Sequence, residues 1–121
     1  MVNAINSALS GLRAASKRLE VSAQNIANQH STKTLVDGKL VNKPYIAQRV
    51  EQVSLAGGGV LIKTRDVNPP TSTVFDPDNP DAGANGELAV PNVSLENEII
   101  NQKLATYDYK ASLKTIKIQN E

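Results

Sequence analysis

The sequence predicts an α+β fold in which long N- and C-terminal helices form an antiparallel, coiled-coil-like pair with a small β-rich insert between them. Three observations predict it: an apolar seam with helical spacing near the N-terminus, short β-branched runs separated by turn residues, and a second helical seam near the C-terminus. We expect an N-terminal helix in 1–30, a β-rich insert with loops in 31–91 and a C-terminal helix in 92–121, the two helices forming one domain. Because only 3% of the 121 residues are aromatic, the core should be thin.

The N-terminal helix is expected from about Asn3 to Asn28. Its seam alternates spacings of four and three, and so occupies one narrow face of the helix. The seam consists of Ile5, Leu9, Leu12, Ser16, Leu19, Ala23 and Ile26. Three small residues, Ala8, Ala15 and Ser22, flank it, so the backbone of another helix can approach closely. This helix is therefore built to pack against other helices.

The middle of the chain reads as short strands separated by turns. Asp37-Gly38 is a tight-turn signal between Thr34–Val36 and Lys39–Val41, which predicts a small hairpin. Further extended segments are expected at Tyr45–Leu55, from Val60 onward, at Thr73–Phe75 and at Glu87–Val90. Between them lie a glycine triplet at 57–59 and a loop rich in Pro, Asp and Asn at 76–86.

The C-terminal helix is expected to begin after Pro91, with Asn92 or Ser94 as its cap. Two apolar sets lie on roughly opposite faces: Ile100, Leu104, Tyr107, Ala111 and Ile118 form one, and Tyr109, Leu113 and Ile116 form the other. A helix that is apolar on two faces needs a partner on each. One partner is expected to be the N-terminal helix, and the other is most simply a neighbouring subunit. The lysines at 103, 110, 114 and 117 are most simply a solvated face, with an acidic partner surface as the alternative.

No segment of the sequence predicts a catalytic, metal or cofactor site, so we expect a protein that is not an enzyme. The formal net charge of +1 argues against nucleic acid as a partner, and the absence of cysteine excludes thiolate chemistry. The carboxylates of Asp76–Asp81 do not match a calcium loop, because Pro80 stands where a ligand is needed and Asp81 where a glycine is needed. An enzyme that uses these carboxylates remains a remote alternative.

The sequence also bears on location. No apolar run approaches the ~18 residues that span a bilayer, so we expect no direct membrane insertion. The N-terminus lacks the basic start, the continuous apolar stretch and the small-residue cleavage site of a secretory signal. If the protein leaves the cytoplasm, we expect a route that requires no cleaved signal.

Two stretches resemble a known family. SALSGLRAASKRLEVSAQNIANQHST (Ser7–Thr32) resembles the N-terminal signature of bacterial flagellar rod and hook proteins, in which a helical run ends in Asn-Ile-Ala-Asn and a nearby Thr. The middle resembles the proximal rod protein family, FlgC, through PYIAQRV (44–50) and through a turn followed by Gly and Pro-Asn-Val. Those turn positions are Phe75, Asp76, Pro77, Asn79, Pro80, Gly86, Pro91, Asn92 and Val93, and Tyr109 and Ala111 match the family's Tyr-x-Ala. The sequence departs from the family at Ser112, in Thr34–Lys43, and at Glu121, where it stops earlier than typical members.

The resemblance implies a structural subunit of the flagellar basal-body proximal rod that polymerises helically through its terminal helices, transmits torque and lines the export channel. Implied partners are other copies of itself, other proximal and distal rod proteins, the basal-body adaptor at the export gate, and the flagellar type III export apparatus. The implied location is the rod in the periplasmic space. Another rod- or hook-related axial protein, or an atypical member of the family, is the alternative. The expected subunit interface comprises Ile5, Leu9, Leu12, Leu19, Ala23, Asn25, Ile26, Asn28, Ile100, Leu104, Tyr107, Tyr109, Ala111, Leu113 and Ile116.

Overall fold

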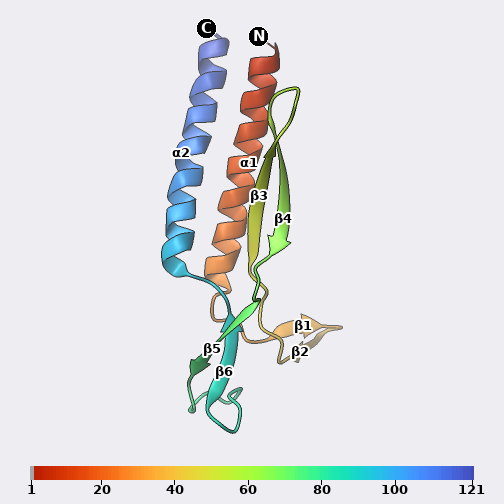
Figure 1. The fold of residues 1–121 in the computed structure, drawn as a ribbon, viewed down its shortest axis with the longest axis vertical. Helices are drawn as coiled ribbons and strands as arrows, with labels where there is room; N and C mark the ends of the chain where they lie inside the picture. Colours follow the sequence, from red (N-terminus) through yellow and green to blue (C-terminus); the bar gives the residue numbers. More distant parts are fainter. Residues whose placement is uncertain (1) are drawn as a thin grey trace.

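The structure, a computed structural model, describes residues 2–121; Met1, which the sequence places in the N-terminal helical segment, lies outside the described residues. The elements in chain order are α1 (Val2–Ala27), β1 (Thr34–Val36), β2 (Lys39–Val41), β3 (Gln48–Ser54), β4 (Val60–Asp66), β5 (Thr71–Phe75), β6 (Glu87–Pro91) and α2 (Leu95–Gln119). The helices run antiparallel and side by side, with both chain ends at one end of the molecule (Figure 1). The predicted α+β fold, with paired terminal helices and a small β insert, is confirmed.

Hydrogen bonds at the end of α1 explain why the helix stops one residue before the predicted boundary. The Asn28 amide still donates to Gln24 O, and the Asn28 side-chain Nδ2 donates to the same carbonyl at 2.9 Å. Ser31 then binds back to Asn28 through its own amide and through its hydroxyl, which donates to Asn28 Oδ1 at 3.2 Å. These bonds satisfy groups that the last turn leaves without helical partners.

At the start of α2, Ser94 rather than Asn92 is the cap. Ser94 has extended backbone angles, and its hydroxyl accepts a hydrogen bond from the Asn97 amide. Glu96 and Glu98 lie in the first turn, where negative charge is favourable beside the positive end of the helix. The amide of Asn92 donates to Pro70 O and its side chain to Pro69 O, so this residue instead fastens the segment before α2 to the start of β5.

Three separate two-stranded antiparallel ribbons make up the insert. In β1–β2 the turn residues Asp37 and Gly38 both have positive φ, as the tight turn requires. In β3–β4 the register pairs Gln48 with Asp66 and Ser54 with Val60, and in β5–β6 it pairs Phe75 with Glu87. The strand expected from Tyr45 begins only at Gln48, because the Tyr45 amide donates to Ser31 O in the loop after α1 instead of to a neighbouring strand.

Small side chains dominate the core, which is as thin as the composition predicts. The buried apolar residues are Ala8, Ala14, Ala15, Val21, Ala47, Leu88 and Ala105. Most of these lie on α1, which is sandwiched between α2 and the β3–β4 ribbon (Figure 1). The largest fully buried side chain is a polar one, that of Asn25. The fold is therefore held by close backbone approach and by specific polar contacts as well as by apolar burial.

Candidate assembly surfaces

The face that α1 turns towards α2 is the row of small residues, not the seam of large ones. Gly11 lies so close to α2 that a Cβ atom there would be 3.0 Å from Ser112 Oγ. Ala8, three residues before Gly11, and Ala15 and Ser22, four and eleven residues after it, lie on the same face and are all buried. On α2 most buried and half-buried positions also recur at spacings of four and three. These positions are Glu98, Gln102, Ala105, Tyr109, Ser112, Ile116 and Gln119, and Thr106 is half-buried beside them. This pattern on α2 was hidden in the sequence, because most of its members are polar or small.

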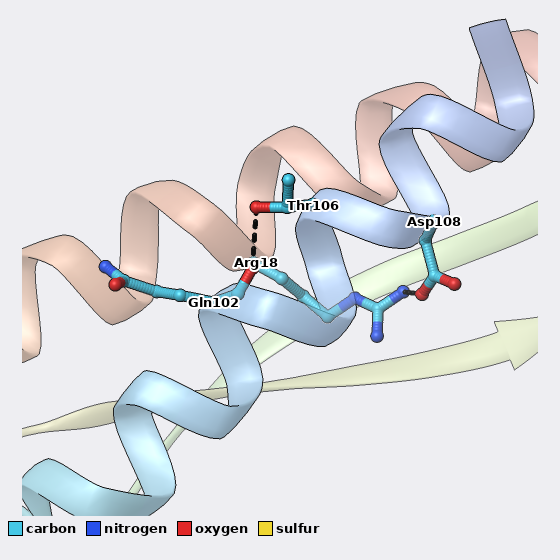
Figure 2. Close-up of polar contacts among 4 residues, drawn as sticks. All are labelled: Arg18, Gln102, Thr106 and Asp108. Atoms are coloured by element: carbon cyan, nitrogen blue, oxygen red, sulfur yellow. Dashed lines mark hydrogen bonds and ion pairs between the residues drawn. The ribbon is translucent and has the colours of Figure 1, made fainter.

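An ion pair crosses the helix pair near its middle. Arg18 Nη2 lies 2.8 Å from Asp108 Oδ2, while Thr106 Oγ1 donates to Gln102 O at 2.8 Å within α2 (Figure 2). The Arg18 side chain is 29% exposed and that of Asp108 is 54% exposed, so solvent screens the pair and its contribution is about 0.2–1 kcal/mol. Its value lies more in fixing the register of the two helices than in stability.

Asn25, from the Asn-Ile-Ala-Asn motif, joins three elements through four hydrogen bonds. Its Nδ2 donates to Gln48 O at 2.7 Å and to Glu98 Oε1 at 3.0 Å. Its Oδ1 accepts from the Gln48 amide and from the Tyr45 hydroxyl, each at 3.0 Å. The side chain is completely buried, and every donor and acceptor it carries is used. Asn25 therefore fixes α1 against both β3 and α2.

Two neighbouring polar groups complete this cluster. Ser22 Oγ donates to Glu98 O at 3.0 Å, so α1 and α2 are bonded again one turn from Asn25. Burial, and in second place the negative charge of Glu98, raise the pKa of the Tyr45 phenol above its ordinary value of about 10. Beside the cluster lies a cavity of about 230 Å³ whose lining includes Arg18, Asn25 and Glu98.

The β3–β4 ribbon is attached to α1 by serines and glycines. Ser10 Oγ accepts a hydrogen bond from the Val60 amide at 3.1 Å. Gly58 and Gly59 have positive φ, and a Cβ atom on them would lie 2.9 Å from Ser7 Oγ and 2.7 Å from Ser10 Oγ respectively. The glycine triplet, which the sequence places only as a separator between two expected strands, thus lets the ribbon lie directly on the helix. Sequence reasoning missed this contact, because neither serine nor glycine carries a periodic apolar signal.

The loop at 76–86 joins β5 to β6 and is tied back to the end of α1. Thr32 Oγ1 donates to Asp81 Oδ2 at 3.3 Å, and Lys33 Nζ lies 3.5 Å from Asp81 Oδ1. The Asp81 amide donates to Asn79 Oδ1 at 2.9 Å, which tightens the turn. Asp81 and the signature residue Thr32 therefore act as a structural link, whereas Asp76 and Asp78 are exposed. Residues 2–121 contain no group of three or more His, Cys, Asp or Glu arranged to hold a metal ion.

The predicted interface residues divide between covered and open positions. Most members on α1 are half-buried, Ala23 is exposed, and Asn25 is fully buried inside the chain. On α2, Tyr109 and Ile116 are half-buried on the side that faces α1. The members that remain exposed on α2 are Ile100, Leu104, Tyr107, Ala111 and Leu113. We call Ile100, Leu104, Tyr107, Ala111 and Ile118 the outer stripe of α2.

Other exposed apolar side chains lie outside the helices, where helical periodicity has no bearing. Leu35 and Leu40, paired across β1–β2, are each 67% exposed on a ribbon that projects sideways from the molecule (Figure 1). Phe75, at the end of β5, is 75% exposed.

On α2 there is also a groove of about 360 Å³, lined by Ile99, Gln102, Lys103, Thr106, Tyr107 and Lys110. Neither described helix is long and apolar enough to cross a membrane.

Comparison with known proteins identifies the family. No family model matches the sequence. The chain is 36% identical over 122 residues to the flagellar basal-body rod protein FlgC of Salmonella typhimurium, covering 96% of this chain and 87% of that protein. It is 35% identical to FlgC of Buchnera aphidicola subsp. Schizaphis graminum, with 97% and 88% covered, and 29% identical to FlgC of Aquifex aeolicus, with 98% and 89% covered. Paired terminal helices, an uncovered apolar stripe and these relatives agree, and the chain belongs to the FlgC family of structural proteins of the flagellar basal-body rod.

Proposed function

We propose that this rod protein polymerises helically, with the outer stripe of α2 as its principal contact to neighbouring subunits. The observation that carries the proposal is the exposure of this stripe, in which Tyr107 is 67% exposed although it lies in the middle of a long helix. Contiguous apolar surface of this kind is costly in water and marks an interaction site. The helix is covered by α1 on its other side, so the stripe is available to another chain.

The α1 seam supplies the second half of the proposed interface. Ile5, Leu9, Leu12, Leu19 and Ile26 are half-buried, so each retains surface that a neighbouring helix can cover. Asn25 contributes indirectly by holding α1 and α2 in register, because its side chain is buried within its own subunit. We also keep Asn28 and Ala23, and on α2 Tyr109, Leu113 and Ile116, as proposed contacts at the edges of the two stripes.

The finer role and partners are likewise proposals. We infer that the subunit lies in the periplasmic part of the rod, contacts other proximal and distal rod proteins and the basal-body adaptor at the export gate, and leaves the cell through the flagellar type III apparatus without a cleaved signal. We infer further that the rod it helps to form lines the export channel and transmits torque. The name shared by the relatives supports association with other rod components. The division into 1–30, 31–91 and 92–121, with the first and last forming one helical unit, fits this role, because the terminal helices would carry the polymer contacts.

The experiment introduces a charge into the outer stripe. Leu104→Asp would place an unpaired carboxylate in an apolar contact, a change that costs several kcal/mol when the charge is buried. We expect the purified variant to remain a folded monomer by circular dichroism, to fail to polymerise in sedimentation assays, and to leave cells non-motile when it replaces the wild-type chain. Asn6→Asp, which adds the same charge at an exposed position of α1, is the matched control. Polymerisation of Leu104→Asp at the concentration that suffices for Asn6→Asp would refute the proposed interface.

A further inference from the structure

Charge is strongly segregated along this chain, although its net charge is only +1. Residues 66–102 contain seven acidic residues and no lysine or arginine. In the fold, Asp66 ends β4, and the other six acidic residues lie on the β5–β6 ribbon, its loop and the first turn of α2. The rest of α2 carries Lys103, Lys110, Lys114 and Lys117, which together with Tyr107 recur at spacings of four and three and therefore share one face.

The acidic end presents an exposed aromatic side chain that packs against its own loop. Phe75 is 75% exposed, yet its ring rests closely on the loop, because a Cβ atom at Gly86 would lie 2.7 Å from Phe75 Cε2 and 3.2 Å from Pro77 Cβ. Asp76 follows it directly, and Glu87 is its partner across the ribbon. Neither carboxylate, nor that of Asp78, makes an ion pair within the described part of the chain. An exposed aromatic ring that packs on its own loop is suited to anchor a contact with another chain.

The α2 groove has the complementary character. Ile99 and Tyr107 give it apolar walls, and Lys103 and Lys110 border it with positive charge. Neither lysine makes an ion pair to any residue from 2 to 121. The β5–β6 ribbon extends beyond the end of the helix pair and points away from this part of α2, so the two surfaces do not meet within one chain (Figure 1).

We propose that the Phe75 end of one copy docks into the α2 groove of a second copy. The ring of Phe75 would enter between Ile99 and Tyr107, while Asp76, Asp78 and Glu87 would face Lys103 and Lys110. The two surfaces are different patches of the same chain, so the contact is head-to-tail and leaves one free patch of each kind at the ends. Such a contact propagates as an open helical filament when the rotation between successive copies does not close into a ring. The inference rests on the proposed self-polymerisation and adds to it the pair of surfaces that sets the direction of stacking.

Reversal of charge tests the pairing. Lys103→Glu with Lys110→Glu, and separately Asp76→Lys with Asp78→Lys, should each raise the protein concentration needed for polymerisation by about 10-fold or more. A chain that carries all four changes should polymerise again at close to the wild-type concentration. Lys63→Glu is the matched control, because Lys63 is exposed on β4 and belongs to neither surface. If the variant with all four substitutions polymerises no better than the variants with two, the inference is wrong.

Cross-linking tests the occupant directly, because the chain contains no cysteine. One sample carries only Asp78→Cys and a second only Lys103→Cys. Oxidation of the mixed polymer should yield a disulfide-linked pair of different copies, whereas a mixture of Asp78→Cys with Lys63→Cys should not. If wild type polymerises but no such pair forms, or if Asp78→Cys cross-links only to a different rod protein, the inference fails while self-polymerisation stands. If the wild-type chain does not polymerise at all, the proposed function itself fails.

Discussion

At the residue scale, Asn25 is the side chain whose role changed most between sequence and structure. The sequence identifies it through the Asn-Ile-Ala-Asn motif and suggests a contact with another subunit. The structure gives it four hydrogen bonds within its own chain. A sequence motif shows that a position has a constrained role, but it does not show which role. The partners of Asn25 lie up to 73 residues away along the chain, so the sequence does not reveal them.

Removal of the Asn25 side chain should be costly. In Asn25→Ala the Gln48 backbone and the Tyr45 hydroxyl lose their partners in a buried site, and we expect the free energy of unfolding to fall by about 3 kcal/mol. Urea unfolding followed by circular dichroism measures the change. Asn28→Ala is the control: its bonds are local to the end of α1, and the expected loss is below about 1 kcal/mol. Equal losses for the two variants would contradict the assigned role of Asn25.

Tyr45 should make the stability of the chain depend on pH in the alkaline range. Its pKa is raised in the folded state, by burial first and by Glu98 second. Above about pH 10 the unfolded chain therefore loses the phenolic proton before the folded chain does, and stability falls as the pH rises towards the folded pKa. The difference in unfolding free energy between wild type and Tyr45→Phe, measured from pH 9 to 12, should decrease with rising pH. A constant difference would show that the two states share one pKa.

At the element scale, the two helices and the positions of the strands were predictable, whereas the strand ends were only approximate, and the packing of the elements was only partly predictable. The outer stripe of α2 follows from its spacing, and Tyr109 and Ile116 of the second apolar set are half-buried, but most of the covered face is polar or small and gives no apolar signal. The contact face of α1 follows only in part: the sequence identifies Ala8, Ala15 and Ser22 as residues that permit close approach, but it does not show that they, and not the seam of large residues, face α2. The exposure of the Phe75 side chain was not predicted either. The spacing of apolar residues along a strand does not show whether a residue at the end of that strand is exposed.

The glycines at the β3–β4 turn give an element-scale prediction. Gly59→Ala places a methyl group 2.7 Å from Ser10 Oγ at a residue with φ of +84°, so we expect a loss of about 2 kcal/mol in unfolding free energy. Gly57→Ala, where nothing lies within 4 Å of the added methyl group, should change it by less than about 0.5 kcal/mol. Thermal unfolding of both variants measures the difference. If both are neutral, the ribbon is not held on α1 through this turn.

At the scale of the whole molecule, α1 is central and α2 is peripheral. α1 packs against α2 on one side and against β3–β4 on another, whereas α2 packs only against α1 among the described elements. The thin core leaves little else to hold α2 in place. The subunit is thus most firmly built around its N-terminal helix.

Hydrogen exchange should reveal this asymmetry. In a verified monomer we expect amides of α2 to exchange faster than those of α1, because fewer tertiary contacts must break for α2 to open. On polymerisation the amides around the outer stripe should slow, while those of α1 near Asn25 change little. Mass spectrometry of peptides from the monomer and the polymer measures both. Equal protection of the two helices in the monomer would mean that α2 is held by more than its contact with α1.

The placement of the bonds between α1 and α2 has a mechanical consequence. Within residues 2–121, every hydrogen bond or ion pair between the helices involves Arg18, Ser22 or Asn25, in the half of α1 nearest the ribbons. Towards the chain ends none of these bonds joins the two helices, which approach each other closely at Gly11. The helix pair is therefore held against sliding at the end near the ribbons. Towards the chain ends the two helices can bend apart more easily.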